Sequence, residues 1–419
     1  MSADPTRKTV ALVDPLWIGH HPMYFSQFTA AFLRLGARVI GLCPDPADAL
    51  QAARKAALTA TPDFDRRVSM HLLPAGRQSW FGGRFEGDPL LTFHRWKRAA
   101  DALHQAELAA GRQADLVFFP YLDSYLRFLP FPAVPGLALG RPWSGLYLRN
   151  HHHGEPPSPL ASLRRLAKGD ALLRSALCRG IGVLDERFTG PLERYTGQEV
   201  LAFPDVTDPT LPARPAPLAA EIRRKAKGRK IIGLIGLERR KGMLNLLRVA
   251  DRARELRLPW YFVCAGRYEH DEYDAAERAL IDRIASRVAD GGIDNLHFDP
   301  AAGRIPDEAD FNSVFASFDL AWIAYEGFEG SSGTLGKAAA FEIPCVATKG
   351  ECIGGRVERY RSGLTIPEGD SDRAFEAIRR LLDGLDWDGR PLAGDFARFR
   401  ADHDQSKLDA VLRHLLSKA

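Results

Sequence analysis

The most informative stretch of the chain reads LAWIAYEGFEGSSGTLGKA and spans residues 320–338. It opens with an apolar run typical of a buried strand, passes through a loop of small residues, and continues into a helix. The small residues of the loop are Gly330, Ser331, Ser332, Gly333 and Thr334. Without bulky side chains, backbone N–H groups at the start of the helix can approach a phosphate, and the hydroxyls can add hydrogen bonds. The stretch therefore predicts an anion site between a strand and a helix.

Two other interpretations compete for this loop. Gly330 to Lys337 resembles the Walker A motif of P-loop NTPases, but five residues separate its first glycine from the Gly-Lys pair. Walker A has about four residues there, and it follows the lysine with a Ser or Thr that holds magnesium, where this chain has Ala338. The spacing excludes a P-loop. A turn that only caps the helix stays open as an alternative.

Strand-like and helical patterns alternate through both halves of the chain, which predicts an α/β fold with parallel sheets covered by helices. The strands expected in the first half are 9–13, 38–42, 68–73, 116–119, 146–148 and 181–184. Those expected in the second half are 231–235, 260–265, 296–298, 320–324 and 345–348. Two doubly wound, Rossmann-like domains result, and such sheets bind their ligands beyond the carboxyl ends of the strands.

A proline-rich stretch, residues 209–217, interrupts this alternation and marks a domain boundary. We predict a first domain at 1–212 and a second at 213–395. The remaining helical segment, 396–419, is expected to pack back on the first domain. Two domains also agree with the length, because 419 residues exceed what one hydrophobic core usually supports.

Bulk composition narrows the class of protein. Hydrophobic residues make up 45% and charged residues 26% of the chain, as in a globular enzyme. The net charge of +4 and the pI near 8.8 suit small anionic ligands or an acidic lipid surface, and the excess is too weak to indicate nucleic acid as a partner.

The N-terminus and the cysteines indicate a cytoplasmic protein. Residues 1–8 are polar and lack the apolar core of a signal peptide, and no later stretch is apolar enough to span a bilayer. The five cysteines include no CxxC pair and mostly lie in apolar surroundings. We therefore expect buried free thiols, with no disulfide and no zinc site.

Three consecutive cations, Arg239, Arg240 and Lys241, follow the first predicted strand of the second domain. Arginine offers forked donors and lysine a point charge, so together they can stabilise a diphosphate leaving group. Taken alone, however, a run of charges is more often a solvated surface.

The order of these elements resembles the family 4 glycosyltransferases of the GT-B fold. That family has an arginine and then Lys-Gly after the first strand of its second domain, later a Glu-Gly-Phe stretch and a second glutamate, and then a small-residue helix ending in Gly-x-Pro-Val-Val-Ala-Thr. The corresponding residues here are Arg239 or Arg240, Lys241-Gly242, Glu326-Gly327-Phe328-Glu329 and FEIPCVAT at 341–348. The resemblance covers most of the second domain.

The resemblance implies two Rossmann-like domains that face each other across a cleft and transfer a sugar from a nucleoside-diphosphate sugar. It also implies retention of anomeric configuration, with neither metal nor other cofactor. The diphosphate would lie between Ser331 to Thr334 and the three cations, while Glu329 or Glu326 binds sugar hydroxyls. The acceptor is expected to be a sugar, a lipid-linked molecule or another small molecule.

One residue departs from the family pattern. Counting back from Pro344, the second glutamate of the family falls on Lys337, eight residues after Glu329. In the family that glutamate usually meets the ribose of the nucleotide. An ammonium group only donates hydrogen bonds, so Lys337 is expected to contact phosphate instead.

The first domain resembles the same family more weakly, through the loop Ile18-Gly19-His20-His21-Pro22. Relatives place this loop beside the donor phosphates and the acceptor. Gly19 permits close approach of the backbone, and His20 or His21 could reach into the cleft. A tight turn whose histidines cap the next helix is the alternative.

A second histidine cluster, His151, His152 and His153, follows a later strand. A metal site is disfavoured, because no Asp or Glu lies at metal-ligand spacing. The resemblance implies instead that one of these histidines, with His151 and His152 as the candidates, contacts the transferred sugar.

Leucines and basic residues alternate along residues 160–179 in an amphipathic pattern. Such a segment can lie on anionic lipid at the inner face of a membrane, but core packing with a solvated basic rim explains the same pattern.

Two further functions stay open at this point. A sugar-nucleotide 2-epimerase uses the same fold, and a non-catalytic sugar-nucleotide-binding protein would explain the loss of the second glutamate.

Overall fold

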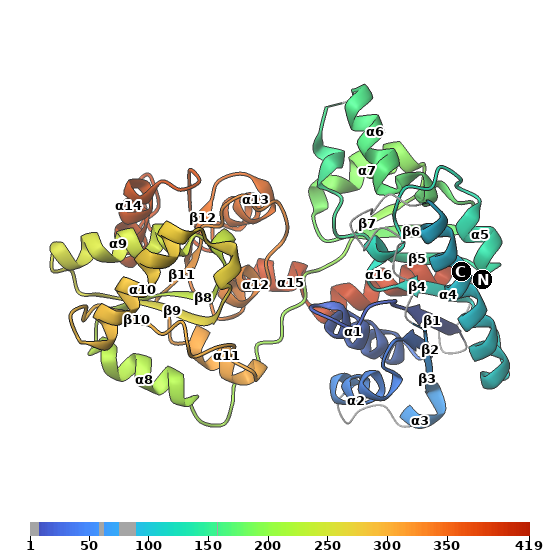
Figure 1. The fold of residues 1–419 in the computed structure, drawn as a ribbon, viewed down its shortest axis with the longest axis horizontal. Helices are drawn as coiled ribbons and strands as arrows, with labels where there is room; N and C mark the ends of the chain where they lie inside the picture. Colours follow the sequence, from blue (N-terminus) through green and yellow to red (C-terminus); the bar gives the residue numbers. More distant parts are fainter. Residues whose placement is uncertain (1–7, 58–62, 75–88, 157) are drawn as a thin grey trace. The chain divides into compact units, whose positions relative to one another are not determined.

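The computed structural model describes residues 8–57, 63–74, 89–156 and 158–419. The chain forms two compact α/β units (Figure 1). Unit 1 comprises Met1–Pro204 and Gln405–Ala419, and unit 2 comprises Asp205–Asp404. The polar N-terminal stretch lies, up to residue 7, outside the described residues.

The unit boundaries differ from those expected at 212 and 396. The segment after Pro204 already belongs to unit 2, because Asn312 donates its side-chain amide to the carbonyls of Asp208 (3.0 Å) and Thr210 (2.7 Å). Near the other end, the helix α15 (Phe396–Asp402) also stays in unit 2, where Phe399 packs against Tyr360 with ring centroids 4.9 Å apart. The proline-rich segment lies close to the first boundary, but the contacts of residues 208 and 210 with Asn312 place the boundary before that segment.

Unit 1 contains a sheet of seven parallel strands in the order β3-β2-β1-β4-β5-β6-β7. The strands are β1 (Thr9–Val13), β2 (Arg38–Cys43), β3 (Val68–Leu72), β4 (Leu116–Phe119), β5 (Trp143–Leu146), β6 (Cys178–Val183) and β7 (Val200–Ala202). The predicted bounds of β5 were wrong. The strand begins at Trp143, which pairs with Val117 and Cys178, and residues 147–148 lie beyond its end. The strand β7 was missed.

Helices cover both faces of this sheet. They are α1 (His21–Arg34), α2 (Pro46–Ala57), α3 (Phe64–Arg67), α4 (Pro89–Ala110), α5 (Val134–Leu139), α6 (Pro159–Lys168), α7 (Thr189–Thr196) and α16 (Gln405–Lys418). On one face Phe28 and Phe32 of α1 pack against Phe118, and on the other Trp96 of α4 packs against Phe119 and Trp143. The last helix, α16, belongs to this unit, where its Asp409 pairs with Arg34 at 3.0 Å.

Unit 2 contains six parallel strands in the order β10-β9-β8-β11-β12-β13. They are β8 (Lys230–Leu237), β9 (Trp260–Tyr268), β10 (Leu296–Phe298), β11 (Leu320–Ile323), β12 (Cys345–Thr348) and β13 (Gly363–Ile366). The edge strand β13 was missed by the sequence reading. It begins at Gly363, where a side-chain Cβ would lie 1.9 Å from the carbonyl oxygen of Cys345, so the close pairing with β12 requires glycine.

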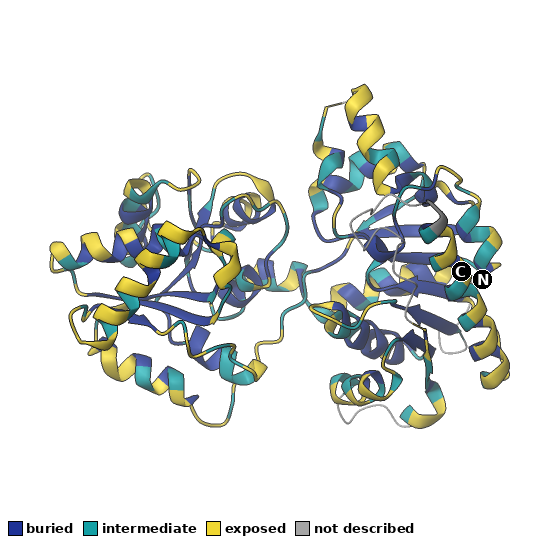
Figure 2. Ribbon diagram, in the orientation of Figure 1, coloured by how far each residue is buried: buried dark blue, intermediate teal, exposed yellow. Residues whose placement is uncertain are grey.

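The central strand β8 shows why these strands read as continuous apolar runs. Ile232 and Leu234 enter the core beneath α9, α10 and α14, whereas Ile231 and Ile235 enter the core beneath α8, α11, α12 and α13. Successive side chains of a strand point to opposite faces, and both faces are covered here (Figure 2). These helices are α8 (Pro217–Ala226), α9 (Met243–Glu255), α10 (Ala275–Ala289), α11 (Glu308–Phe315), α12 (Gly333–Ala340), α13 (Glu351–Tyr360) and α14 (Ser371–Leu382).

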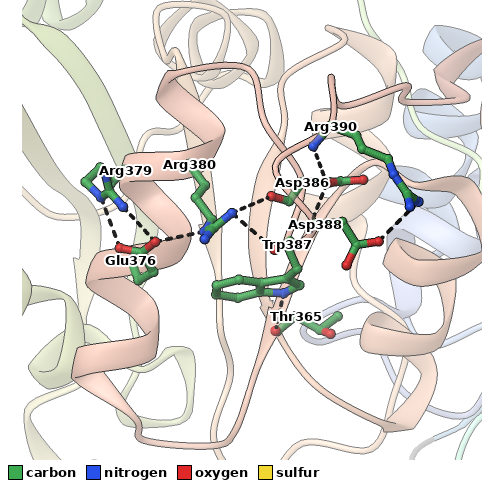
Figure 3. Close-up of polar contacts among 8 residues, drawn as sticks. All are labelled: Thr365, Glu376, Arg379, Arg380, Asp386, Trp387, Asp388 and Arg390. Atoms are coloured by element: carbon green, nitrogen blue, oxygen red, sulfur yellow. Dashed lines mark hydrogen bonds and ion pairs between the residues drawn. The ribbon is translucent and has the colours of Figure 1, made fainter.

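The segment after α14 folds back on that helix through a clasp of polar contacts (Figure 3). Arg380 donates to the backbone carbonyls of Asp386 and Trp387, both at 3.1 Å, and Glu376 accepts from both Arg380 and Arg379. The indole of Trp387 donates to the carbonyl of Thr365 at 3.2 Å. These contacts thus fasten Asp386 and Trp387 to α14 and β13.

The cysteines and the helices can be compared with the expectations of free thiols and of no membrane-spanning segment. All five cysteines lie among the described residues and are buried and unpaired, as predicted. Within the described ranges, no helix combines the length and the apolar character needed to cross a membrane.

Candidate functional site

The strands β8 and β11 are neighbours in the unit 2 sheet, so the loops at their carboxyl ends lie together. The backbone N–H of Glu326 donates to the carbonyl of Arg240 at 2.7 Å, and the indole of Trp322 donates to the carbonyl of Lys241 at 3.1 Å. Gly242 has a φ of +71°, and a Cβ there would lie 2.3 Å from the carbonyl oxygen of Ala324. Only glycine therefore allows the cationic turn to approach the loop after β11 so closely.

The three predicted cations have different surroundings. Arg239 forms a forked ion pair with Glu277 of α10, with its Nη2 at 2.9 Å from Oε1, and about half of its side chain is exposed. Arg240 pairs with Glu238 and lies over the ring of Phe328, 4.9 Å from its centroid. Arg240 thus faces the loop after β11, whereas Arg239 faces α10.

Lys241 is the most enclosed of the three cations. Its Nζ donates to the carbonyl of Ile235 at 2.9 Å and lies 3.3 Å from Glu238. The ammonium also rests over Gly236, where a Cβ would collide with it at 2.2 Å. A charged group is thereby held at the carboxyl end of β8.

The helix α12 begins with an open set of backbone donors. Its N-cap residue, Ser332, makes no capping hydrogen bond, and its hydroxyl donates to the phenol of Tyr325 at 3.2 Å. The same phenol donates to Thr334 Oγ1 at 3.1 Å. Among the described residues, none accepts a hydrogen bond from the backbone N–H groups of 331–334. Those groups are the usual binding site for an anion at a helix N-terminus.

The two candidate glutamates, Glu326 and Glu329, both lie between the end of β11 and the start of α12. Glu326 is half-buried, and burial raises its pKa while the charge of Arg239 opposes the rise. Glu329 is exposed and, with Tyr325, Gly327 and Phe328, lines a cavity of about 300 Å³. That volume lies at the lower end of the range for small-molecule sites.

Lys337 points away from the open donors of α12. Its side chain is buried, with the residue only 6% exposed, and its Nζ donates to the carbonyl of Asp208 at 2.6 Å and to Glu308 at 2.5 Å. Both partners belong to unit 2. The position where the family has a ribose-binding glutamate is thus occupied by a lysine that fastens α12 to the segment leading into the unit. Its contact with a nucleotide stays a prediction.

In unit 1, the loop after β1 carries the predicted Gly19 and His20, and α1 begins at the predicted His21. Gly19 has a φ of +60°, which favours glycine. His21 is buried, and its Nδ1 lies 2.8 Å from both carboxylate oxygens of Asp14. Its ring stacks on Tyr121, with centroids 4.1 Å apart. Asp14, which the sequence reading did not single out, was recognisable as the polar residue directly after a buried strand.

The loops after β4 and β5 are joined by a second buried carboxylate. Asp123 accepts hydrogen bonds from the backbone N–H groups of Leu148 at 2.9 Å and Arg149 at 2.7 Å. Burial raises the pKa of Asp123, and these two hydrogen bonds oppose the rise. The bonds hold the start of the histidine cluster in place.

A third buried carboxylate, Asp170, organises the histidine cluster. Its Oδ2 lies 2.7 Å from His152 Nε2 and 2.8 Å from His153 Nε2, and its Oδ1 accepts from the Tyr147 hydroxyl at 2.8 Å. Burial acts to raise the pKa of Asp170, but the two histidines outweigh it, so the pKa lies below its ordinary value. His151 contacts the ring of Phe188 instead, with centroids 5.6 Å apart.

The fold brings an acidic residue to the histidines, so the expectation that no Asp or Glu could join them in a metal site was wrong. An acidic residue does accompany the histidines, and His152, His153 and Asp170 offer a set of possible metal ligands. Two observations favour hydrogen bonding: the separations from nitrogen to oxygen are hydrogen-bond lengths, and no described group accepts from His153 Nδ1. A metal-bound histidine almost always donates its other N–H to an acceptor. Metal independence nevertheless stays a prediction.

Residues 160–179 do not form one helix. The helix α6 ends at Lys168, and Gly169 has a φ of +83° with the backbone of Arg127 so close that a Cβ would not fit. A 3-10 turn, Asp170–Arg174, follows. Leu160 and Leu163 are 59% and 61% exposed on α6, so the apolar face expected to pack or to meet lipid is at the surface.

Comparisons with known proteins agree with this architecture. Residues 229–384 match the family model described as Glycosyl transferases group 1. No match is found among curated protein sequences.

Solved structures of the same fold cover nearly the whole chain. Sucrose-phosphate synthase (tll1590) from Thermosynechococcus elongatus is 18% identical, with 97% of each chain covered and a TM-score of 0.62. A UDP-forming alpha,alpha-trehalose-phosphate synthase from Burkholderia xenovorans is 14% identical, with 98% of each chain covered and a TM-score of 0.64. Anabaena Alr3699/HepE in complex with UDP is 14% identical, with 98% of this chain and 100% of that chain covered and a TM-score of 0.64.

The family match contains the cationic turn, the loop after β11 and the open start of α12. The structural matches give the architecture of both units, which is GT-B. This chain therefore carries a group 1 glycosyltransferase domain within a two-domain GT-B fold and is a glycosyltransferase.

Proposed function

We propose that the chain transfers a sugar from a nucleoside-diphosphate sugar to an acceptor hydroxyl, with the donor bound by unit 2. The observation that supports this most strongly is the start of α12, where the backbone N–H groups of 331–334 have no acceptor among the described residues. A diphosphate supplies the anionic oxygens that such donors bind. Arg240 and Lys241 lie on the adjacent strand end and would stabilise the charge that develops on the leaving group.

The donor class also rests on the similarity to Anabaena HepE, which has been solved with UDP and with UDP-glucose. UDP-glucose is accordingly the first donor to test. The cavity beside Glu329 is the candidate place for sugar hydroxyls, because a carboxylate accepts hydrogen bonds from them.

The resemblance to family 4 adds the finer parts of the proposal. Transfer would proceed with retention and without a metal, since cations of the protein supply the charge stabilisation that magnesium supplies elsewhere. The acceptor would be a sugar, a lipid-linked molecule or another small molecule. Exposed Leu160 and Leu163 beside the basic residues of α6 support contact with an anionic membrane surface, at the cytoplasmic face.

A single substitution tests the phosphate site directly. Gly333 is the first residue of α12, where proline is tolerated, and Ser332 before it is extended with φ −134° and ψ 120°, as proline requires of its predecessor. Gly333→Pro therefore deletes one N–H donor without breaking the helix. Gly333→Ala is the matched control, because a Cβ there meets no atom within 4 Å and the N–H is kept.

Calorimetric titration with UDP compares the two variants. A hydrogen bond to a charged oxygen contributes about 1.5–3 kcal/mol, so Gly333→Pro should bind UDP about 10- to 100-fold more weakly than Gly333→Ala. Equal affinities of the two variants would place the phosphates elsewhere and contradict the proposal.

A further inference from the structure

The phenol of Tyr325 forms hydrogen bonds with two hydroxyl groups at the start of α12. Its oxygen lies 3.2 Å from Ser332 Oγ and 3.1 Å from Thr334 Oγ1. Ser332 is the N-cap residue of the helix, and Thr334 is its second residue. A phenol carries one hydrogen and also accepts, so it can bond to both hydroxyls at once, whichever way their hydrogens point. Tyr325 therefore engages both hydroxyl groups of the helix start.

Tyr325 is itself held firmly within unit 2. The residue is only 3% exposed and lies two positions after the end of β11. Its backbone carbonyl accepts a hydrogen bond from the hydroxyl of Thr348, the last residue of β12, at 2.5 Å. Its ring packs edge-on against Phe328, with centroids 5.5 Å apart. The phenol is thus presented to α12 from a fixed position.

Another helix of the chain shows what a serine does at the N-cap in the ordinary case. Ser158 precedes α6 with an extended backbone, φ −154° and ψ 162°, and its hydroxyl accepts from the N–H of Ala161 at 3.0 Å. Ser332 is extended as well, with φ −134° and ψ 120°, but its side chain caps nothing. An extended backbone is typical of a capping serine. The hydrogen bond to Tyr325 is what distinguishes Ser332.

A cap on α12 would occupy a donor that the ligand needs. An N-cap hydroxyl accepts from the N–H of the second or third helical residue, which here are Thr334 and Leu335. The N–H of Leu335 already donates to the carbonyl of Ser332 at 3.0 Å. Within the described part of the chain, the N–H of Thr334 has no acceptor. A serine cap would therefore fall on Thr334.

We propose that Tyr325 is a positioning residue of the phosphate site. By holding the hydroxyls of Ser332 and Thr334, it prevents a serine cap on α12 and keeps the Thr334 N–H available to a phosphate oxygen of a nucleoside diphosphate. The phosphate in this statement rests on the proposed function. The effect on the cap does not, because it is a property of the chain without ligand. The Ser332 hydroxyl is thereby assigned to Tyr325, and not to phosphate as the sequence alone indicated.

Hydrogen exchange of the Thr334 amide, measured by NMR without ligand, tests the cap. Tyr325→Phe keeps the ring but leaves the Ser332 hydroxyl without its partner, so Ser332 should cap Thr334. Exchange of that amide should then slow about 5-fold, the factor that corresponds to a typical N-cap hydrogen bond. In the double variant Tyr325→Phe/Ser332→Ala the exchange rate should return to that of wild type. Equal rates in Tyr325→Phe and the double variant overturn the proposal.

Calorimetric titration with UDP measures the consequence for binding. Tyr325→Phe should bind UDP about 5-fold more weakly than wild type, because UDP must displace the cap. The double variant should regain the affinity of Ser332→Ala, which in turn should match wild type. A merely structural defect at Tyr325 would not be repaired by removing a second hydroxyl.

The control is Tyr360→Phe, which removes another buried phenol hydroxyl of unit 2. That hydroxyl bonds to Asp402 at 2.7 Å, and Tyr360 is the last residue of α13, at the end of the helix remote from the carboxyl end of β12. Its affinity for UDP should equal that of wild type.

The outcomes separate this proposal from the proposed function. If wild type binds UDP, the role of Tyr325 is overturned when the double variant binds no more tightly than Tyr325→Phe. A loss of 10-fold or more in Ser332→Ala alone would assign its hydroxyl to phosphate and also overturn the proposal. Absence of UDP binding in wild type contradicts the proposed function, while the exchange rates still decide whether Tyr325 prevents the cap.

Discussion

At the carboxyl edge of the unit 1 sheet, three buried carboxylates hold the polar side chains, whereas at the same edge of unit 2 the polar groups are backbone donors and cations near the surface. Asp14, Asp123 and Asp170 each satisfy a histidine or a pair of backbone N–H groups. In unit 2 the start of α12 keeps its donors open toward the described residues, and Arg240 pairs with Glu238 on its own turn and lies over the ring of Phe328.

This difference indicates two ways to prepare a binding site. Unit 1 orders its groups before any ligand arrives, at the expense of buried charge that must stay satisfied. Unit 2 leaves the positive N-terminal end of α12 open to an anionic ligand, which can accept hydrogen bonds from its backbone N–H groups. Substitutions in unit 1 should therefore affect stability first, and substitutions in unit 2 should affect ligand binding or rate first.

The largest expected effect is in unit 1. Asp170→Ala leaves two histidines and the Tyr147 hydroxyl buried without their acceptor. Each unpaired group costs roughly 1–3 kcal/mol, so the free energy of unfolding should fall by at least about 3 kcal/mol. Urea unfolding measures the loss. Because the pKa of Asp170 is lowered in the folded state, its contribution is present above about pH 4 and fades as the pH falls through the folded pKa.

A matched control separates this effect from general loss of a carboxylate. Glu199→Gln removes a carboxylate that also pairs with a histidine, but at the surface, and should cost less than about 1 kcal/mol. Similar losses of unfolding free energy in Asp170→Ala and Glu199→Gln would contradict the idea that buried carboxylates order the carboxyl edge of the unit 1 sheet.

The next effect is on rate in unit 2. Arg240→Ala and Lys241→Ala should each lower UDP-glucose turnover about 100-fold, equivalent to about 3 kcal/mol of transition-state stabilisation. Unfolding free energy should change by less than about 1 kcal/mol for Arg240, whose ion pair and contact with Phe328 are partly exposed. Unchanged turnover in both variants would remove this turn from the active site.

Lys337→Glu sharpens the comparison, because Lys337 is a buried charged group of unit 2 and in this respect resembles the carboxylates of unit 1. The new carboxylate would face Glu308 and the carbonyl of Asp208, so unfolding should require about 2 kcal/mol less. Adding Glu308→Lys should restore part of the loss. A double-mutant cycle measures the coupling, and no coupling between the two positions would place Lys337 outside this contact.

Arg239→Ala should have the smallest effect. Its ion pair with Glu277 is at the surface, and such pairs contribute about 0–1 kcal/mol. Turnover should fall much less than in Arg240→Ala, since the guanidinium of Arg239 is held by Glu277 of α10. A loss equal to that of Arg240→Ala would assign the arginine role to Arg239 instead.

Most of the fold could be predicted because its signals are local. The apolar runs at Thr9–Val13 and Cys345–Thr348 correspond to strands with the expected bounds. The edge strands β7 and β13 were missed: β7 has three residues, and β13 begins with a glycine, a residue that is depleted in strands.

The candidate site could be predicted where it depends on one loop. The small residues at 330–334 indicated open donors at a helix start, and the structure has them. The partners of the histidines could not be predicted. Asp170 lies seventeen residues after His153, and only the 3-10 turn that follows Gly169 brings it to both rings.

By itself, the sequence determined the alternation of strands and helices, the division into two α/β units, and the residue types at the carboxyl ends of the strands. These properties depend on periodicity and composition over a few residues. Only the tertiary structure decided that Lys337 fastens α12 to Asp208 and Glu308, and that Asp14 orients His21. Those pairings depend on distances between side chains on separate elements, and the packing of the elements sets such distances.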